Sequence, residues 1–426
     1  MNTVFSIVAK NYLPLAFALG QTIKKNCPGV SYSILLADDV EGLDHLDEQP
    51  FKIHTLDVLD IEDINVMAFK YNVTEFCTAV KPYYIDFLFK KGYEKVIYFD
   101  PDICVFSSLQ NIYDELENAS IIVTPHFITP ETAYSGTITE SLLLHVGTFN
   151  LGFIAVANTI AGRKFVEWWK SRLYSQCYQD KIEALHTDQK WIDLAPSFFG
   201  ESLNISRDIG RNMAFWNLHE RRLTGSVEGD WKVENRFDQQ VTSLTFFHFA
   251  GFDINNCQSV IHKNHPEYTM EDFPELKEFF DSYKKLLKSN GFDKFIKLPY
   301  GFGRFRNGAI ITNFQRRLFR RALEEGVIFE HPFEVNNSSF YATLKKHDLI
   351  SKSSTNIDKL NNRNYESFSS KIKLLNFLML TVKKILGFDN YSLLLKFCQR
   401  YFRPENQIFL ISRFRNSYTF KNENQK

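Results

Sequence analysis

The sequence predicts an α/β fold in which helices cover both faces of a largely parallel β-sheet. Short apolar runs that suit buried strands alternate with helical patterns through the first hundred residues. Polar residues follow directly after three of these runs, at 11–12, 38–39 and 100–102, where open α/β sheets bind their ligands. Apolar residues make up 44% of the 426 residues and charged residues 23%, which excludes a disordered or fibrous chain.

The individual elements follow from local patterns in chain order. Apolar runs predict buried strands at 4–9, 33–37, 94–99, 121–123 and 153–156. A helix can begin at Pro14, because proline is tolerated in a first helical turn. Further helices are predicted at 79–90, 161–174 and 275–288. Aromatic side chains recur at helical spacing in the last two, which is typical of core packing, and we assign them no function.

Charge is balanced overall but not along the chain. The 50 Lys and Arg residues equal the 50 Asp and Glu residues, which argues against a general nucleic-acid binder. Residues 297–426 carry 23 basic and 10 acidic residues, whereas residues 1–296 carry 27 basic and 40 acidic residues. An acidic front part and a basic tail predict two surfaces with different partners.

Cysteine usage and the N-terminus indicate a cytoplasmic protein. The six cysteines are scattered without a C-x-x-C pair, which fits a reducing compartment. No basic segment precedes the apolar run at 4–9, so we interpret this run as a strand and not as a signal peptide. No apolar stretch approaches the ~18 residues that a membrane span needs.

We expect a catalytic domain at 1–265, a helical extension packed on it at 266–350, and a linker with a basic amphipathic tail at 351–426. Residues 371–386 mix leucine, isoleucine and phenylalanine with four lysines, as helices on membrane surfaces do. Such a helix would bring the protein to the inner face of an anionic membrane. The alternative is a terminal helix packed on the body with solvated lysines, and the sequence leaves both open.

Asp100 and Asp102 form a D-x-D pair at the end of an apolar strand. Alternate side chains of an extended segment point the same way, so the two carboxylates can converge. A bound divalent cation removes the repulsion between them, and oxygen ligands suit Mg²⁺ or Mn²⁺. The alternative is an Asp-Pro turn with solvated acids.

Three further segments carry polar residues beside apolar runs. His248 follows an aromatic run and is an acceptable third Mn²⁺ ligand, although a core histidine is the alternative. Gly251, three residues later, would let the backbone approach a diphosphate. Asn150 precedes a buried strand, and Asp188 and Gln189 open a helical stretch, where Asp188 could also be a simple helix cap.

In chain order these motifs read Y-L-P, D-D, K-P, D-P-D, F-N-x-G-F, D-Q and H-x-x-G. The set resembles the retaining sugar transferases of glycosyltransferase family 8, the glycogenin and lipooligosaccharide galactosyltransferase type with the GT-A fold. The resemblance spans residues 1–255, and the chain is also similar to bacterial surface-polysaccharide transferases. It implies metal-dependent, retaining transfer from a nucleotide-diphosphate sugar, with UDP favoured, to a saccharide or glycolipid acceptor.

The resemblance also implies a role for each matching residue. The residues that match the family's contacts to the nucleotide sugar are Ala9, Asn11 and Tyr12 for the base, Asp39 for the ribose or base, Lys81 and Gly251 for the diphosphate or donor sugar, and Asn150 for a sugar. Asp100, Asp102 and His248 match the metal ligands, and Asp188 and Gln189 match the pair that flanks the reacting anomeric carbon.

One departure concerns the leaving group. The family motif continues H-x-x-G-x-x-K-P-W, but Gly251 is followed by residues without that lysine. Lys263, or an arginine of 301–306, is the candidate replacement. The departure keeps an inverting transferase on the same fold open, with His219 or Asp253 as the general base. A non-catalytic sugar-nucleotide-binding or assembly protein is the other alternative.

Two basic segments allow a functional and a structural interpretation. Residues 216–222 are rich in hydrogen-bond donors beside Trp216, which suits either an acceptor-side or phosphate-side loop or a structural loop. Residues 309–321 predict a helix with an arginine-rich face. That face would be solvated by default, with contact to an anionic lipid as the alternative.

Overall fold

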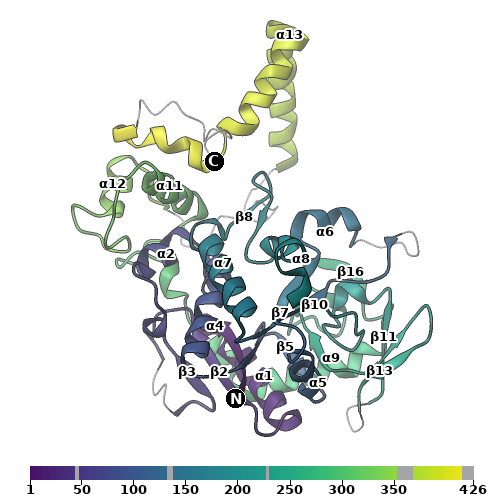
Figure 1. The fold of residues 1–426 in the computed structure, drawn as a ribbon. Coiled ribbons are helices and arrows are strands. Elements are labelled where there is room, and N and C mark those ends of the chain that lie inside the picture. The colour runs from purple at the N-terminus through teal and green to yellow at the C-terminus, as the bar shows by residue number, and fades with distance from the viewer. Residues whose placement is uncertain (44–47, 132–137, 227–229, 353–367, 415–426) are drawn as a thin grey trace. The chain divides into compact units, whose positions relative to one another are not determined.

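The computed structural model describes residues 1–43, 48–131, 138–226, 230–352 and 368–414 (Figure 1). At its centre lies a seven-stranded β-sheet. From one edge to the other its strands are β10 (Leu203–Ile205), β6 (Ile121–Pro125), β7 (Phe149–Ala157), β4 (Lys95–Phe99), β1 (Asn2–Val8), β2 (Ser31–Leu36) and β3 (Lys52–His54).

The sheet is mostly parallel, which confirms the predicted α/β class. β1 runs parallel to both of its neighbours, β2 and β4, and the pairs β2–β3 and β10–β6 are parallel as well. β7 is antiparallel to β4 and to β6. All nine residues of β7 are buried, and such a run carries no sign of strand direction. β7 also begins at Phe149, earlier than the predicted 153, so Asn150 lies within the strand and not before it.

Helices cover both faces of the sheet (Figure 1). Successive strand residues point to opposite faces. Val4 therefore packs in a cluster with Leu19 of α1 (Leu13–Asn26), while the ring of Phe5 lies 5.1 Å from that of Tyr84 in α4 (Lys81–Lys90). The other helices of this part are α3 (Val73–Ala79), α5 (Gln110–Glu115), α6 (Glu140–Val146), α7 (Ile160–Gln176) and α8 (Ala195–Phe199).

Further short strands and two helices lie outside the central sheet. Short strands form a ribbon, a three-stranded sheet and hairpins: β5 (Ile103–Val105) with β14 (Phe246–His248), β11 (Arg221–Thr224) with β12 (Lys232–Asn235) and β13 (Val241–Ser243), β15 (Val260–His262) with β16 (His265–Thr269), and β8 (Gln179–Asp180) with β9 (Leu185–His186). Two helices follow, α9 (Leu276–Ser289) and α10 (Phe292–Phe295). The aromatic stripe of α9 is buried, as predicted for core packing.

The chain divides into two compact units. The first contains Met1–Glu62 and Val73–Gly301, and the second contains Asp63–Asn72 and Phe302–Lys426. The sequence places boundaries at 265 and 350, whereas the first unit includes α9 and α10 and runs to Gly301. The second unit also takes α2 (Ile64–Lys70) from the front part of the chain, together with α11 (Asn313–Glu324) and α12 (Phe340–Lys346).

The arginines of α11 are buried, and this corrects the expectation of a solvated or lipid-binding face. The guanidinium of Arg316 donates hydrogen bonds to the carbonyl oxygens of Phe69 and Tyr71, at 2.6 and 2.7 Å. Arg320 donates to Glu324, at 3.1 Å. Arg316 therefore joins α11 to α2, because α2 ends at Lys70 and leaves carbonyl groups that need donors.

The C-terminal helix α13 (Phe368–Tyr401) contains the predicted helix at 371–386 and continues beyond it, with a kink at Gly387. Its described side chains are exposed or partly exposed throughout, so the structure does not show a closely packed terminal helix. The predicted linker at 353–367 and the chain end at 415–426 lie outside the described residues. In the described part of the chain, no helix is both long enough and apolar enough to cross a bilayer.

Candidate functional site

Three neighbouring parallel strands end at the same edge of the sheet and place the predicted polar residues there. A short 3₁₀ helix, Lys10–Tyr12, follows β1 directly after the buried Ala9 and carries Asn11. Asp38 and Asp39 follow β2, and the D-x-D pair follows β4. This edge of the sheet was predicted from the sequence, because the carboxyl ends of adjacent parallel strands must coincide.

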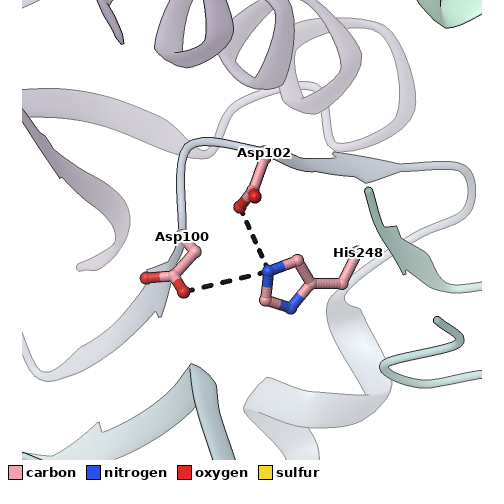
Figure 2. Close-up of side chains that lie close together, drawn as sticks. All are labelled: Asp100, Asp102 and His248. Atoms are coloured by element: carbon pink, nitrogen blue, oxygen red, sulfur yellow. Dashed lines mark ion pairs between the residues drawn. The ribbon is translucent and has the colours of Figure 1, made fainter. Parts of the chain in front are cut away.

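Asp100, Asp102 and His248 converge through a tight turn and a two-stranded ribbon. The amide of Ile103 donates to the Asp100 carbonyl at 3.1 Å, so the chain turns between β4 and β5. β14 pairs antiparallel with β5 and sets His248 opposite Ile103. The Nε2 atom of His248 then lies 3.1 Å from Asp102 Oδ1 and 3.9 Å from Asp100 Oδ2 (Figure 2).

These three side chains fit a divalent cation. Their candidate ligand atoms all lie within 4.8 Å of one another. The side chains of Asp100 and Asp102 are 32% and 23% exposed, so a ligand can reach them from solvent, whereas His248 is buried. Two carboxylates with one imidazole nitrogen form a donor set that suits Mn²⁺ or Mg²⁺.

Burial and mutual charge interactions shift the pKa values of all three groups. Burial raises the pKa of Asp100. Burial acts in the same direction on Asp102, but the charge of His248 and its hydrogen bond outweigh it, so the pKa of Asp102 is lowered. For His248, burial favours the neutral form, yet the two carboxylates dominate and raise its pKa. A cation binds only the neutral imidazole, so cation binding competes with protonation of His248.

Gly152 makes room for the imidazole of His248. A Cβ atom at Gly152 would lie 2.5 Å from the Cε1 atom of His248, closer than any real contact. The carbonyl of Gly152 also accepts a hydrogen bond from the amide of Asp100, at 2.8 Å. Gly152, the glycine of F-N-x-G-F, therefore helps to position both His248 and Asp100.

A cavity of about 430 Å³ opens beside Asp102. Its lining includes Tyr12, Gly251 and Lys263, and helices α9 and α10 close it with Tyr283 and neighbouring residues. Gly251 has φ +67°, and a Cβ atom there would overlap the ring of His262, so the turn requires glycine. The amide of Lys263 donates to the Gly251 carbonyl at 2.9 Å, and the charge of Lys263 contributes to lowering the pKa of Asp102.

Lys263 therefore lies beside the turn at Gly251, although in the sequence it stands well after the position of the family's motif lysine. The other candidates for a replacement cation have partners within the second unit. Arg304 donates to the Gly308 carbonyl at 2.8 Å, and Arg306 lies 3.6 Å from Glu334. Lys263 lines the cavity that Asp102 also lines, which favours it among the candidates.

Lys81 and Asp188 form a buried ion pair next to Tyr98. Lys81 is the first residue of α4, and its Nζ lies 2.6 Å from Asp188 and 2.8 Å from the carbonyl oxygen of Leu151. The ammonium also lies 3.9 Å from the ring centre of Tyr98, whose hydroxyl donates to Asp100. Lys81 therefore contacts the predicted catalytic residue Asp188 directly and Asp100 through the side chain of Tyr98.

Gln189 is held by hydrogen bonds to backbone groups of β7 and α6, and Asn150 by a hydrogen bond from the side chain of Asn212. The Oε1 atom of Gln189 accepts from the Leu151 amide and its Nε2 donates to the Val146 carbonyl, both at 3.0 Å. The Oδ1 atom of Asn150 accepts from Asn212 Nδ2 at 3.1 Å. These two predicted site residues are therefore fixed in position close to Gly152.

Asp39, the predicted ribose or base contact, is paired within the chain. Its carboxylate accepts a hydrogen bond from the buried Lys10, whose amide donates to Asp38 at 3.1 Å. The other oxygen of Asp38 accepts from the Gly301 amide at 2.8 Å. Burial raises the pKa of Asp38 to about 6, against these hydrogen bonds and the charge of Lys10. The role of Lys10 was not predicted from the sequence. The signal for it was its position directly after β1, since Asp38 and Asp39 follow the next strand of the same sheet edge.

Residues 216–222 run from the end of a 3₁₀ helix, Phe215–Asn217, into β11. Trp216, Glu220 and Arg221 are buried. Arg221 donates to the carbonyl of Arg211 at 2.8 Å, and Glu220 accepts from the amide of Thr129 at 2.9 Å. These contacts favour the structural interpretation of Glu220 and Arg221, while the ring of Trp216 lies 5.1 Å from that of His248.

The two candidate general bases lie in different surroundings. His219 lies beside Phe127, with ring centres 5.2 Å apart. Asp253 lines the cavity, where its carboxylate accepts from the amide of Asn255 and from Nδ2 of Asn256, at 3.0 and 2.8 Å.

Comparisons with known proteins give distant similarities. The chain is similar to the uncharacterized protein YfnF of Bacillus subtilis strain 168, with 23% identity over 282 residues that cover 65% of this chain and 89% of that protein. Among solved structures it is similar to the galactosyltransferase LgtC in complex with donor and acceptor sugar analogs, at 16% identity over 50% of this chain and 76% of that chain, with a TM-score of 0.34. It is also similar to the apo bifunctional glycosyltransferase WbbM, at 13% identity over 67% of this chain and 49% of that chain, with a TM-score of 0.36. No family model matches the chain, so membership of glycosyltransferase family 8 stays a prediction.

Proposed function

We propose that this protein is a metal-dependent glycosyltransferase that uses a nucleotide-diphosphate sugar, with a GT-A fold. One observation carries the proposal: Asp100, Asp102 and His248 converge beside a cavity that Gly251 and Lys263 also line. A cation site, a close backbone approach and a lysine together suit a diphosphate. UDP is the favoured nucleotide on the resemblance of the motifs.

Each end of the donor meets groups of matching chemistry in this proposal. Tyr12, on the cavity wall, offers an aromatic face to the base, with Ala9 and Asn11 beside it. Lys263 faces the diphosphate, where it neutralises charge on the leaving group. When bound, Mn²⁺ or Mg²⁺ supplies further positive charge to the diphosphate oxygens. Asp39, whose carboxylate is paired with Lys10, contacts the ribose or base only through its remaining lone pairs.

The sugar end of the donor lies toward β7 in this proposal. The carboxylate of Asp188 is fixed by Lys81, and the side-chain amide of Gln189 by backbone groups, so neither moves freely. Asn150 contacts the donor or acceptor sugar. Fixed dipoles and charges of this kind stabilise positive charge at an anomeric carbon without reorganisation. Retention of configuration, which the motif resemblance implies, belongs to the proposal together with a saccharide or glycolipid acceptor in bacterial surface-polysaccharide synthesis at the inner face of the membrane.

Donor hydrolysis tests the proposal. Purified protein is incubated with UDP-, GDP- and dTDP-sugars in Mn²⁺, in Mg²⁺ and in EDTA, and released nucleotide is measured. We expect metal-dependent hydrolysis of one donor that is lost in Asp102→Asn and kept in Glu278→Gln, a change at an exposed carboxyl on α9. Activity that persists in EDTA or in Asp102→Asn would overturn the metal assignment.

Product analysis separates the alternatives that the sequence leaves open. Nucleotide binding without turnover across donors and acceptors would identify a non-catalytic sugar-nucleotide-binding protein. If transfer occurs, the anomeric configuration of the product, read by NMR, distinguishes retention from inversion. If the product has inverted configuration and Asp253→Asn abolishes transfer, Asp253 on the cavity wall is the general base.

A further inference from the structure

The first arm of α13, residues 369–386, presents an apolar face to solvent. At 100° per residue, six large apolar residues of this arm fall within an arc of about 120°, and the one lysine inside that arc is Lys371 in the first turn. The side chains on this arc are Leu374, Leu375, Leu378, Val382, Ile385 and Leu386. Leu374 is 60% exposed and Ile385 is 76% exposed, so this face is not covered by the described chain.

The opposite side of the same arm is basic. Lys373, Lys383 and Lys384 lie there with Asn376 and Leu380, and all five side chains are exposed. None of the three lysines is paired with an acidic side chain in the part of the chain that the structure describes. A wide apolar arc opposite a lysine face is the arrangement of helices that lie in the plane of a membrane interface.

The second arm, after the kink at Gly387, has the same composition. Phe388, Leu393 and Phe397 are exposed large apolar residues, and Figure 1 shows the two arms as separate lengths of helix in yellow-green. Residues 368–403 contain seven basic residues and a single acidic one, Asp389. A second copy of this chain would bring two strongly positive helices together, whereas an anionic surface complements them.

We propose that α13 is a peripheral membrane anchor that binds bilayers containing anionic phospholipids. The apolar arc enters the boundary between head groups and acyl chains, and the lysines of the opposite face contact lipid phosphates. Each lysine near an anionic surface contributes about fivefold to the partition coefficient, and each buried leucine contributes about tenfold or more. The kink at Gly387, where φ is +74°, sets the angle between the two arms.

Vesicle sedimentation of the full-length protein tests the anchor. Vesicles of phosphatidylcholine alone are compared with vesicles that also contain phosphatidylglycerol. We expect binding only to the anionic vesicles and weaker binding at high salt, because salt screens the lysines. Reversing the charge of Lys373, Lys383 and Lys384 to Glu should lower the partition coefficient at least about hundredfold, because three attractive charges are lost and three repulsive ones are added. Leu378→Glu with Ile385→Glu should lower it by a similar factor.

Matched variants control for charge and for hydrophobicity. Lys25→Glu, Lys277→Glu and Lys288→Glu make the same charge change at exposed lysines of α1 and α9 and should leave vesicle binding unchanged. Ile160→Glu with Ile328→Glu is the matched apolar control, since both isoleucines are about 80% exposed.

Three results would overturn the anchor. Absence of binding to anionic vesicles is the first, and an equal loss in the controls is the second. The third is a dimer by sedimentation velocity that Leu378→Glu with Ile385→Glu dissociates without any vesicle binding, since the arc would then face a second copy. The readout requires no sugar donor, so a failed anchor and a failed transferase proposal remain distinguishable.

Discussion

The ammonium of Lys81 lies 2.6 Å from the carboxylate of Asp188, and both side chains are almost completely buried. The two residues are far apart in the chain and lie on α4 and after β9. The ion pair stabilises two buried charges, and it also fixes Asp188, which is a predicted catalytic residue. Mutagenesis can separate the two roles.

Lys81→Met should lower the free energy of unfolding by about 3–5 kcal/mol, because it leaves the Asp188 carboxylate buried without a counter-charge. Urea denaturation at pH 7 measures the change. The double variant Lys81→Met with Asp188→Leu should regain most of that stability, since no buried charge remains, while transfer stays absent. A double variant as unstable as the single one would contradict the ion-pair account.

Gly152→Ala should weaken Mn²⁺ binding about 10- to 100-fold, because a Cβ atom would push the imidazole of His248 out of place. Titration followed by the electron paramagnetic resonance of free Mn²⁺ measures the affinity. Gly200→Ala is the control, since a Cβ atom at Gly200 meets nothing within 4 Å. Equal affinities in the two variants would show that the position of His248 does not matter for the cation.

Lys263→Gln should lower the turnover number about hundredfold, because the leaving diphosphate loses a positive charge in the transition state. Steady-state donor hydrolysis measures it, and Lys263→Arg should recover part of the rate. Lys277→Gln removes an exposed lysine from α9 and should be neutral. If Lys263→Gln keeps the wild-type rate, another group must neutralise the leaving group.

Asp38 should make the protein less stable as the pH rises from about 4 to 7. Burial raises the pKa of Asp38 to about 6 from an ordinary 3.8, so the folded state holds a proton that the unfolded state has already lost. Ionising the buried group then costs about 3 kcal/mol, a cost that is absent below the lower pKa and complete above the higher one. Urea denaturation of wild type and Asp38→Asn across this range measures it.

As the pH rises, the free energy of unfolding of Asp38→Asn should increase relative to that of the wild type by about 3 kcal/mol. Glu278→Gln, at an exposed carboxyl, should show no such trend. A pH-independent difference for Asp38→Asn would contradict the raised pKa.

The α/β class and the edge of the sheet that carries the candidate site could be predicted from the sequence. Each strand is a short apolar run followed by polar residues, and parallel strands end at a common edge. Asn11, Asp39 and Asp100 therefore came to the same region without knowledge of any long-range contact. The His248 segment could be assigned to this region only by its resemblance to a family, because its own apolar run fits many places in a core.

The tertiary structure alone decided how these residues are paired. Lys10 pairs with the carboxylate of Asp39, and Lys81 pairs with that of Asp188. A buried charge is stable only beside a counter-charge, which can come from any part of the chain. Arg316 is buried for the same reason, since carbonyl groups at the end of α2 need donors that the sequence pattern of α11 cannot reveal. Local patterns determine which residues face inward or end a strand, while the partners of buried charges are set by contacts between segments that only the folded chain brings together.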